Sequence, residues 1–305
     1  MTSESHKNTE KKIWLPLPDP FSFEHCLDFL NRNSYESLHE VHPNKVIKLL
    51  KLEGQLYLTE IACWEKMMGL RCLNRAWTTA AEKAATQYVT MLFDLDRDLK
   101  SFYLQMSEEP LMGDLTRQFR GLRMIGFPDL FEALCWSVIG QQINLSFAYR
   151  LKQRLVTTYG SKLFWKGKHY YTFPDPQTVS GISENEFRNW QYSASKTNYL
   201  QNVAQQMVTG SLNLESLQRM PTEAAISRLL EIKGIGPWSA HYVAMKCLRR
   251  PEAFPQQDVG LHHAIKLRTG ASEKPSTKQL EKLGRKWHPW QGYATFYLWH
   301  TLIVS

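Results

Sequence analysis

A glycine-containing turn and one carboxylate that follows it are the residues best suited to chemistry. The turn is Gly234-Ile235-Gly236-Pro237 and the carboxylate is Asp258, both within residues 222–268. Apolar residues recur at helical spacing before and after the turn, and Gly234 and Gly236 can take backbone angles closed to other residues, so we expect a helix-hairpin-helix. The N–H groups that begin a helix are unpaired and lie at the positive end of its dipole, so they attract phosphate. An ordinary αα-corner closed by glycine is the alternative.

The charge of the chain is distributed unevenly. The 305 residues carry a formal net charge of +8, and 43% of them are hydrophobic. Residues 1–112 hold 13 Lys and Arg against 16 Asp and Glu, whereas residues 113–305 hold 24 against 13. A basic second part predicts a polyanionic partner. Because no apolar run approaches 18 residues and no basic amphipathic helix stands out, nucleic acid is favoured over a membrane.

The cysteines and the N-terminus indicate a reducing compartment. The cysteines are odd in number and form no CxxC pair, which argues against a zinc framework and against an iron–sulfur cluster. They are Cys26, Cys63, Cys72, Cys135 and Cys247. The first twelve residues, MTSESHKNTEKK, lack the apolar core of a signal peptide. We therefore predict an intracellular protein.

The chain divides into three parts by pattern. Residues 1–12 are expected to be a disordered tail, residues 13–112 an α+β domain with a small antiparallel sheet, and residues 113–305 a helical core. In the α+β domain we expect one helix and three strands, while 65–93 fits either helices or strands. The helix is 21–31 and the strands are 36–42, 44–51 and 55–63. The sequence assigns this domain no chemistry.

The helical core shows amphipathic stripes and helix start signals. Phe131 begins an apolar stripe that ends near Gly140, and Asn144 is placed to cap the next helix. The aromatic and basic segment 161–175 suits either a β-hairpin or an irregular loop. The remaining predicted helices are 145–158, 183–192, 195–209, 214–219, the two helices of the hairpin, 259–268 and a last region, 277–303.

Four segments together resemble a known superfamily. They are LEIKGIGPWSA at 230–240, FPQQDVGL at 254–261, FEALCWSVIGQQ at 131–142, and WHPWQGYA at 287–294 followed by YLW at 297–299. In their order and spacing along the chain they resemble the helix-hairpin-helix DNA glycosylases. The WHPWxxYAxxYLW segment and the preceding α+β domain resemble the AlkA-type DNA-3-methyladenine glycosylase II branch. The resemblance implies a mainly α, two-lobed glycosylase core behind the α+β domain.

The resemblance assigns the chemistry to Asp258. Breaking an N-glycosidic bond develops positive charge on the sugar, and a fixed carboxylate stabilises that charge and orients water. Asp258 also suits the N-cap of the helix that follows, and the two roles are compatible. Trp238 stands where family members that also cleave the DNA backbone carry a Schiff-base lysine, so we expect a monofunctional enzyme. Lys233 lies outside that position.

The same resemblance makes Trp238 and Trp299 walls of the pocket that holds a flipped base. Aromatic faces attract cations, and a ring-alkylated purine is cationic and leaves readily. The expected substrates are 3-methyladenine and 7-methylguanine. Core packing is the alternative for both tryptophans, and it is favoured for Trp136, Trp287 and Trp290.

Further positions are carried over for DNA binding. Gln142 falls at the wedge position, where a large apolar side chain stands in the best-known AlkA-type enzyme, and a solvated turn is its alternative. Gly234, Ile235 and Gly236 are expected to contact DNA. The backbone carbonyls implied to hold a structural Na⁺ or K⁺ are those of Leu230, Ile232 and Ile235. His262 and His263 are not expected to bind a metal, because neighbouring helical side chains point about 100° apart and no third ligand lies at metal spacing. They are read as a DNA-facing or structural pair.

The expected activity is hydrolytic excision of alkylated purines from double-stranded DNA in base excision repair. No further cofactor is required for this reaction. The alternatives are a non-catalytic helix-hairpin-helix DNA-binding protein and a bifunctional glycosylase/lyase for oxidised bases. We expect a monomer that is DNA-associated, in the cytoplasm or nucleoid of a bacterium.

Overall fold

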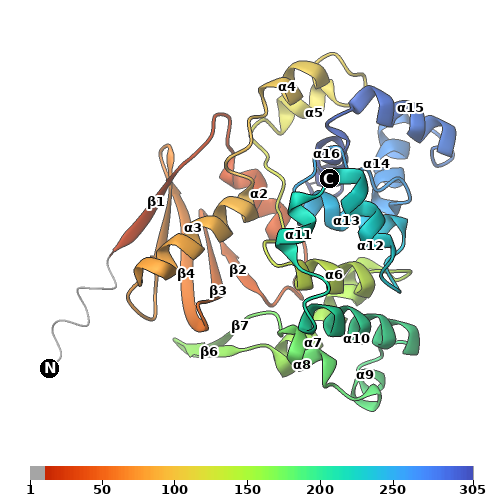
Figure 1. The fold of residues 1–305 in the computed structure, drawn as a ribbon. Coiled ribbons are helices and arrows are strands. Elements are labelled where there is room, and N and C mark those ends of the chain that lie inside the picture. Colours follow the sequence, from red (N-terminus) through yellow and green to blue (C-terminus); the bar gives the residue numbers. More distant parts are fainter. Residues whose placement is uncertain (1–10, 305) are drawn as a thin grey trace, which may run out of the picture.

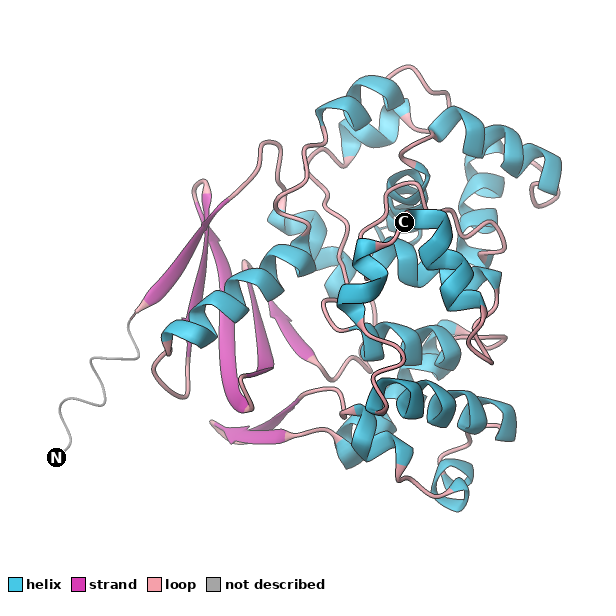
Figure 2. Cartoon of the chain, in the orientation of Figure 1, coloured by secondary structure: helices cyan, strands magenta, loops and turns pink. Residues whose placement is uncertain are grey.

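An antiparallel sheet lies beside a larger assembly of helices (Figures 1 and 2). The computed structural model describes residues 11–304. The first strand, β1, spans Lys12–Pro16 and so begins one residue inside the segment expected to be a tail. Residues 1–10 of that expected tail lie outside the described residues. The predicted fold class is confirmed: a mainly helical core preceded by an α+β region.

The sheet has five antiparallel strands in the order β1-β5-β4-β3-β2. Besides β1 they are β2 (His39–His42), β3 (Lys45–Leu52), β4 (Gln55–Trp64) and β5 (Met67–Cys72). Glu53 and Gly54 join β3 to β4 and both have positive φ, the backbone that two-residue hairpins favour. The ambiguous segment 65–93 contains β5 and then helix α3 (Thr79–Phe93), which packs against β1 and β3.

Helices make up most of the rest of the chain. They are α2 (Phe23–Leu30), α4 (Lys100–Met106), α5 (Gly113–Gln118), α6 (Leu130–Ile139), α7 (Leu145–Tyr159), α8 (Pro176–Ser180), α9 (Glu184–Asn189), α10 (Ala194–Val208), α11 (Leu214–Arg219), α12 (Thr222–Leu230), α13 (Pro237–Lys246), α14 (Val259–Thr269), α15 (Thr277–Trp287) and α16 (Gln291–Val304). Asn144 caps α7 as predicted, accepting the N–H of Phe147 at 2.8 Å. Segment 161–175 was expected to be either a β-hairpin or an irregular loop. It contains the β-hairpin, formed by β6 (Lys162–Trp165) and β7 (Lys168–Tyr171).

The helices pack in two groups. In one, α6 contacts α7, α10 and α13; in the other, α16 contacts α2, α5, α14 and α15. The last helical region, predicted as 277–303, is divided because Pro289 lacks the N–H that would continue α15. One continuous hydrophobic core extends from the sheet to α16. The boundary at residues 112 and 113 stays a prediction.

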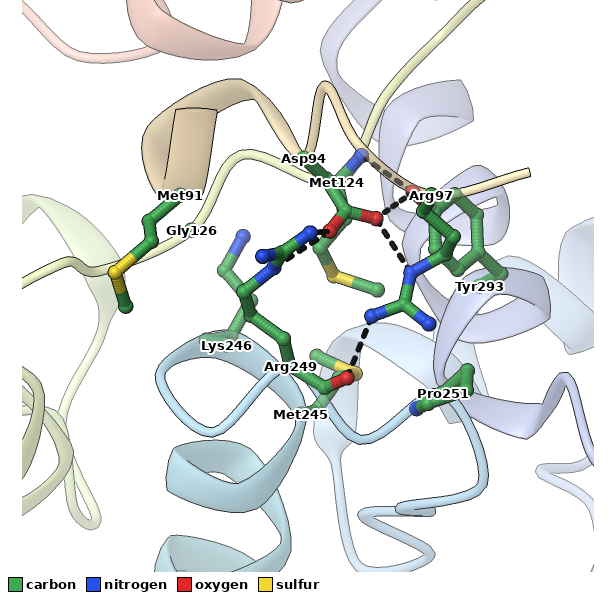
Figure 3. Close-up of a pocket in the computed structure, with 10 residues that line it drawn as sticks. All are labelled: Met91, Asp94, Arg97, Met124, Gly126, Met245, Lys246, Arg249, Pro251 and Tyr293. Atoms are coloured by element: carbon green, nitrogen blue, oxygen red, sulfur yellow. Dashed lines mark hydrogen bonds and ion pairs between the residues drawn. The ribbon is translucent and has the colours of Figure 1, made fainter. Parts of the chain in front are cut away.

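A buried carboxylate, Asp94, joins the end of α3 to the helical core. It accepts hydrogen bonds from Arg97 Nε and Arg249 Nε, each at 2.7 Å, and from the Tyr293 hydroxyl (Figure 3). Asp94 is 2% exposed, so its charge is neutralised by these partners rather than by water. Arg249 follows α13 and Tyr293 lies on α16, so one carboxylate connects three segments.

A second buried ion pair joins the same two parts of the molecule. Lys152 Nζ, on α7, lies 2.6 Å from Glu36 Oε2 just before β2. Burial acts to raise the pKa of Glu36, but the Lys152 ammonium and the other groups that face the carboxylate together hold that pKa well below its usual range. These two buried charged contacts attach the α+β region to the helices.

Within residues 11–304, the helices are too short or too polar to cross a bilayer.

Candidate active site

A cleft of about 1640 Å³ contains all the residues expected to handle the base. The loop after α6, the hairpin before α13, the start of α14, and helices α16 and α2 form its walls. Asp258, Trp238, Trp299 and Gln142 line it together, although they are far apart in the sequence. The structure therefore brings the predicted acid, pocket walls and wedge into one space.

Asp258 occupies the N-cap of α14. Its Oδ1 accepts the backbone N–H of Leu261 at 2.7 Å, which is an ordinary capping bond. The same carboxylate lies in the cleft wall and is partly exposed. Capping fixes the carboxylate at the cleft without removing it from the cleft surface. The two interpretations of Asp258 are thus compatible in one geometry.

Two tryptophans on different helices donate hydrogen bonds to the Asp258 carboxylate. Trp238 Nε1, on α13, donates to Oδ2 at 2.8 Å, and Trp299 Nε1, on α16, donates to Oδ1 at 2.7 Å. Hydrogen bonds to an ionised acceptor are stronger than neutral ones. Both indoles remain partly buried at the cleft. They therefore position the acid as well as lining the pocket, a role that the sequence did not indicate.

The aromatic wall contains a residue that the sequence did not single out. Tyr242 lies one helical turn after Trp238 on α13, and their rings stack at 5.2 Å and 29°. Its ring also lies 6.0 Å from that of Trp299. Burial raises the pKa of the Tyr242 hydroxyl far above its usual value, so this wall is uncharged. The i,i+4 spacing of aromatic residues was the available signal.

The other tryptophans differ in position. Trp287 and Trp290 are buried in the core, as expected. Trp136 is also 5% exposed, yet it contributes to the cleft wall. For Trp136 the expectation of a core position therefore describes only part of its surroundings.

The hairpin requires its first glycine more than its second. Gly234 has a φ of +101°, and a Cβ there would lie 2.3 Å from the Tyr199 ring. Gly236 has a φ of −90°, open to any residue, so the expectation of special backbone angles is wrong for it. A Cβ on Gly236 would meet no atom within 4 Å. Gly236 has no side chain to cap α13, which leaves that helix start accessible to a ligand.

The hairpin backbone suits a cation bridge. The side chains of Ile232 and Ile235 are buried and hold the turn in place, while Leu230 is 42% exposed. The Ile232 carbonyl accepts the Ile235 N–H at 2.9 Å, and a carbonyl oxygen keeps a second lone pair for a metal. The Na⁺ or K⁺ site on these three carbonyls stays a prediction.

Hydrogen bonds to the hairpin and to α10 fix the loop between α6 and α7 in place. Gln142 is exposed at the cleft mouth with a φ of +56°. Its neighbour Gln141 donates to the Gly234 carbonyl at 2.9 Å and to Ser239 Oγ at 3.1 Å. Lys196 donates to the Ile139 and Gln141 carbonyls at 2.6 and 2.7 Å. The wedge loop and the hairpin are consequently one connected unit.

The α+β region contributes to the cleft through α2. Phe29 and Asp28 lie on α2, and Asn31 and Arg32 follow it; all four line the cleft. The Arg32 guanidinium lies 3.9 Å from the centre of the Phe29 ring. No motif in the sequence indicated this wall, because α2 reaches the cleft by packing beside segments that lie far away in the sequence. The domain with no predicted chemistry thus supplies a wall of the site.

The two neighbouring histidines take separate positions. His262 Nε2 lies 2.6 Å from the Gln256 carbonyl, so it holds the loop that precedes Asp258. His263 is exposed. The structural interpretation fits His262, and a DNA contact by His263 stays a prediction.

Removing one indole N–H at a time should separate the positioning of Asp258 from stacking on the base. We expect Trp299→Phe, which keeps an aromatic side chain and loses one hydrogen bond to Asp258, to lower the single-turnover rate of base release about tenfold. Trp238→Phe should behave in the same way. Trp287→Phe, in the core, is the control. If both cleft variants kept the wild-type rate while unfolding normally, the indole hydrogen bonds would have no role in the chemistry.

Comparisons with known proteins agree with this geometry. Residues 135–289 match the HhH-GPD superfamily of base excision DNA repair proteins, and residues 15–134 match the 8-oxoguanine DNA glycosylase N-terminal domain. A DNA-3-methyladenine glycosylase of Bacillus subtilis is 38% identical over 293 residues, covering 95% of this chain and 97% of the relative.

Two solved structures share the fold. The 3-methyladenine DNA glycosylase of Archaeoglobus fulgidus has a TM-score of 0.82 at 20% identity, covering 94% of this chain and 97% of its own. The 8-oxoguanine glycosylase/lyase of Clostridium acetobutylicum, in complex with double-stranded DNA, has a TM-score of 0.73 at 20% identity, with 92% and 91% covered. The resemblance drawn from the four sequence segments is confirmed: the chain belongs to the HhH-GPD superfamily of base excision DNA repair proteins, as a DNA glycosylase of the AlkA type.

Proposed function

We propose that this glycosylase removes alkylated purines, of the 3-methyladenine and 7-methylguanine type, by hydrolysis alone. The observation that carries the proposal is a carboxylate, Asp258, held by two indoles inside an aromatic cleft. The aromatic faces of Trp238, Tyr242 and Trp299 suit a cationic base. The name of the Bacillus subtilis relative supports the same substrate class.

The hydrogen bonds at Asp258 leave it one position for the reaction. An ionised carboxylate has about four acceptor positions. Oδ1 accepts from Leu261 and Trp299, whereas Oδ2 accepts from Trp238. The remaining lone pair of Oδ2 is therefore the one that faces a sugar or a water molecule.

The reaction begins when the damaged nucleotide leaves the stack and enters the cleft. The C1′–N bond then breaks, the base keeps the bonding electron pair, and positive charge develops on the sugar. The fixed carboxylate of Asp258 stabilises that charge. Water adds its oxygen to C1′ and releases a proton, leaving an abasic site. The alkylated base, cationic before cleavage, departs as a neutral molecule.

The lysines argue for a monofunctional enzyme. Among the described residues, those that line the cleft include no lysine. By the resemblance, Trp238 stands where the lyase members carry their Schiff-base lysine. Lys246, on the same helix, is 1% exposed, and its Nζ lies 4.4 Å from the centre of the Phe296 ring. Lys233 is exposed outside the cleft. For either amine to form a Schiff base with C1′, the protein would have to rearrange so that the lysine enters the cleft.

Incubation with methylated duplex DNA tests this function. We expect release of free 3-methyladenine and 7-methylguanine, intact strands bearing abasic sites, and no covalent adduct after borohydride treatment. Release by hydrolysis without an adduct separates this function from both alternatives. A protein that binds DNA and releases no base would be the non-catalytic binder. A borohydride-trapped adduct would instead identify the glycosylase/lyase. Hypoxanthine and ethenoadenine in the same panel rank the lesions.

The same proposal includes the binding partner, the cellular location and the cofactors of the enzyme. The partner is double-stranded DNA with damaged bases, bound by a monomer at the hairpin, at Gln142 and along the basic helical core. The expected setting is the cytoplasm or nucleoid of a bacterium. No cofactor takes part in bond breaking, and the hairpin cation is structural.

A further inference from the structure

Three potential metal ligands gather where α2 meets α16, outside the reaction described above. They are His25 and Asp28 on α2 and His300 on α16. Asp28 Oδ2 lies 3.8 Å from His25 Nδ1 and 3.9 Å from His300 Nε2. One donor atom from each residue lies within 4.8 Å of the other two. These distances are too long for hydrogen bonds, so direct pairing does not explain the cluster.

His300 makes the cluster unusual. It is 0% exposed, and neither ring nitrogen has a hydrogen-bond partner among the described residues. Burying an unpaired polar group costs about 1–3 kcal/mol, so such a group calls for an explanation. Its Nε2 is directed at Asp28. An imidazole nitrogen without a hydrogen-bond partner has a lone pair that it can donate to a metal ion.

The three donors have the chemistry of a zinc site. Two imidazoles and one carboxylate, with water as the fourth ligand, form a common Zn²⁺ set. Tetrahedral Zn²⁺ with ligands at about 2.0–2.1 Å places the donors about 3.4 Å apart, so the present separations need only small side-chain rotations. We propose that His25, Asp28 and His300 bind a divalent transition-metal ion, for which Zn²⁺ is the best fit.

The surroundings of the three residues suit an ion. The Phe119 ring packs edge-on against His300 at 4.7 Å and against His25 at 5.6 Å, which limits their motion. The side chains of His25 and Asp28 are 23% and 39% exposed, so the metal has an entry path from solvent. The ion links α2, which supplies part of the cleft wall, to the helix that carries Trp299.

Such an ion is a structural link between the first and last helices of the described chain. It binds the folded protein, in which α2 and α16 are adjacent, and has no preformed site in the unfolded chain. At a Zn²⁺ concentration 100 times the dissociation constant, it lowers the unfolding equilibrium constant about 100-fold. The ion takes no part in the proposed bond breaking, although its ligand Asp28 also lines the cleft.

The test uses the full chain without a histidine tag, after treatment with EDTA. Equilibrium dialysis against micromolar Zn²⁺ should give one bound equivalent, and Co²⁺ should produce the visible absorption of a low-coordinate site. Thermal unfolding should shift upward with added Zn²⁺. The partly exposed ligands are changed by His25→Gln and Asp28→Asn, which leave the core intact. His263→Gln, at an exposed histidine outside the cluster, is the matched control.

Each ligand variant should weaken Zn²⁺ binding more than about tenfold, and the double variant should lose the bound equivalent and the thermal shift. The His263→Gln control should bind as the wild type does. The proposal fails if the wild type binds no Zn²⁺ at micromolar concentration. It also fails if the double variant, folded by circular dichroism, binds as tightly as the wild type.

Discussion

Replacing Asp258 with asparagine should lower the single-turnover rate of methylpurine release by about 1000-fold, or about 4 kcal/mol of transition-state stabilisation. The change removes the negative charge and keeps the size of the side chain. The asparagine oxygen can still cap α14 through the N–H of Leu261 and accept from Trp299. Its amide then faces Trp238 Nε1, so two donors meet where a charged acceptor stood.

The stability of this variant provides the control. Because asparagine is as good an N-cap as aspartate, we expect the free energy of unfolding to fall by no more than about 1 kcal/mol. DNA binding, measured with an uncleaved duplex, should remain. A near-normal release rate from a normally folded Asp258→Asn protein would show that the carboxylate charge has no part in bond breaking.

Replacing Asp94 with asparagine should lower the free energy of unfolding by about 3–5 kcal/mol, measured by urea denaturation. Asp94 is 2% exposed and neutralises both Arg97 and Arg249. A neutral side chain leaves the Arg97 charge without its carboxylate partner and leaves Arg249 with the exposed Asp96 alone. The loss should also weaken the attachment of the α+β region to the helices.

Asp96 offers a matched control for this variant. Its carboxylate also pairs with Arg249, but its side chain is 58% exposed. Asp96→Asn should therefore cost less than about 1 kcal/mol, because water screens the pair. Equal effects of the two changes would mean that burial at Asp94 does not set the strength of the contact.

The sequence predicted the parts of the site that short segments define. The hairpin, the N-cap at Asp258 and the turn at Gln142 each depend on local backbone chemistry, so local spacing identified them. Three of the five strands, β2, β3 and β4, followed from local alternation and lie near the expected places, whereas β1 was not predicted and β5 lies in a segment that fitted either structure. The glycine argument succeeded at Gly234, where a ring lies against the backbone, and failed at Gly236, where space is open.

What the sequence did not indicate depends on packing between distant segments. The indole N–H groups of Trp238 and Trp299 reach Asp258 from helices separated by 20 and 41 residues in sequence from that acid. Tyr242 and the residues of α2 join the cleft for the same reason. Aromatic residues in an apolar helix have the same pattern whether they fill a core or face a ligand, so only the tertiary contacts distinguish the two.

Helix α16 has a consequence for how the protein is made. It supplies Trp299 to Asp258, Tyr293 to Asp94 and Phe296 to Phe29, and the Tyr293–Asp94 pair spans 199 residues. A ribosome synthesises α16 after every one of these partners. The nascent chain can form its sheet early, but α2 and α3 wait for their last contacts until synthesis reaches α16. A nascent chain that has not reached α16 therefore lacks the Trp299 hydrogen bond that orients Asp258.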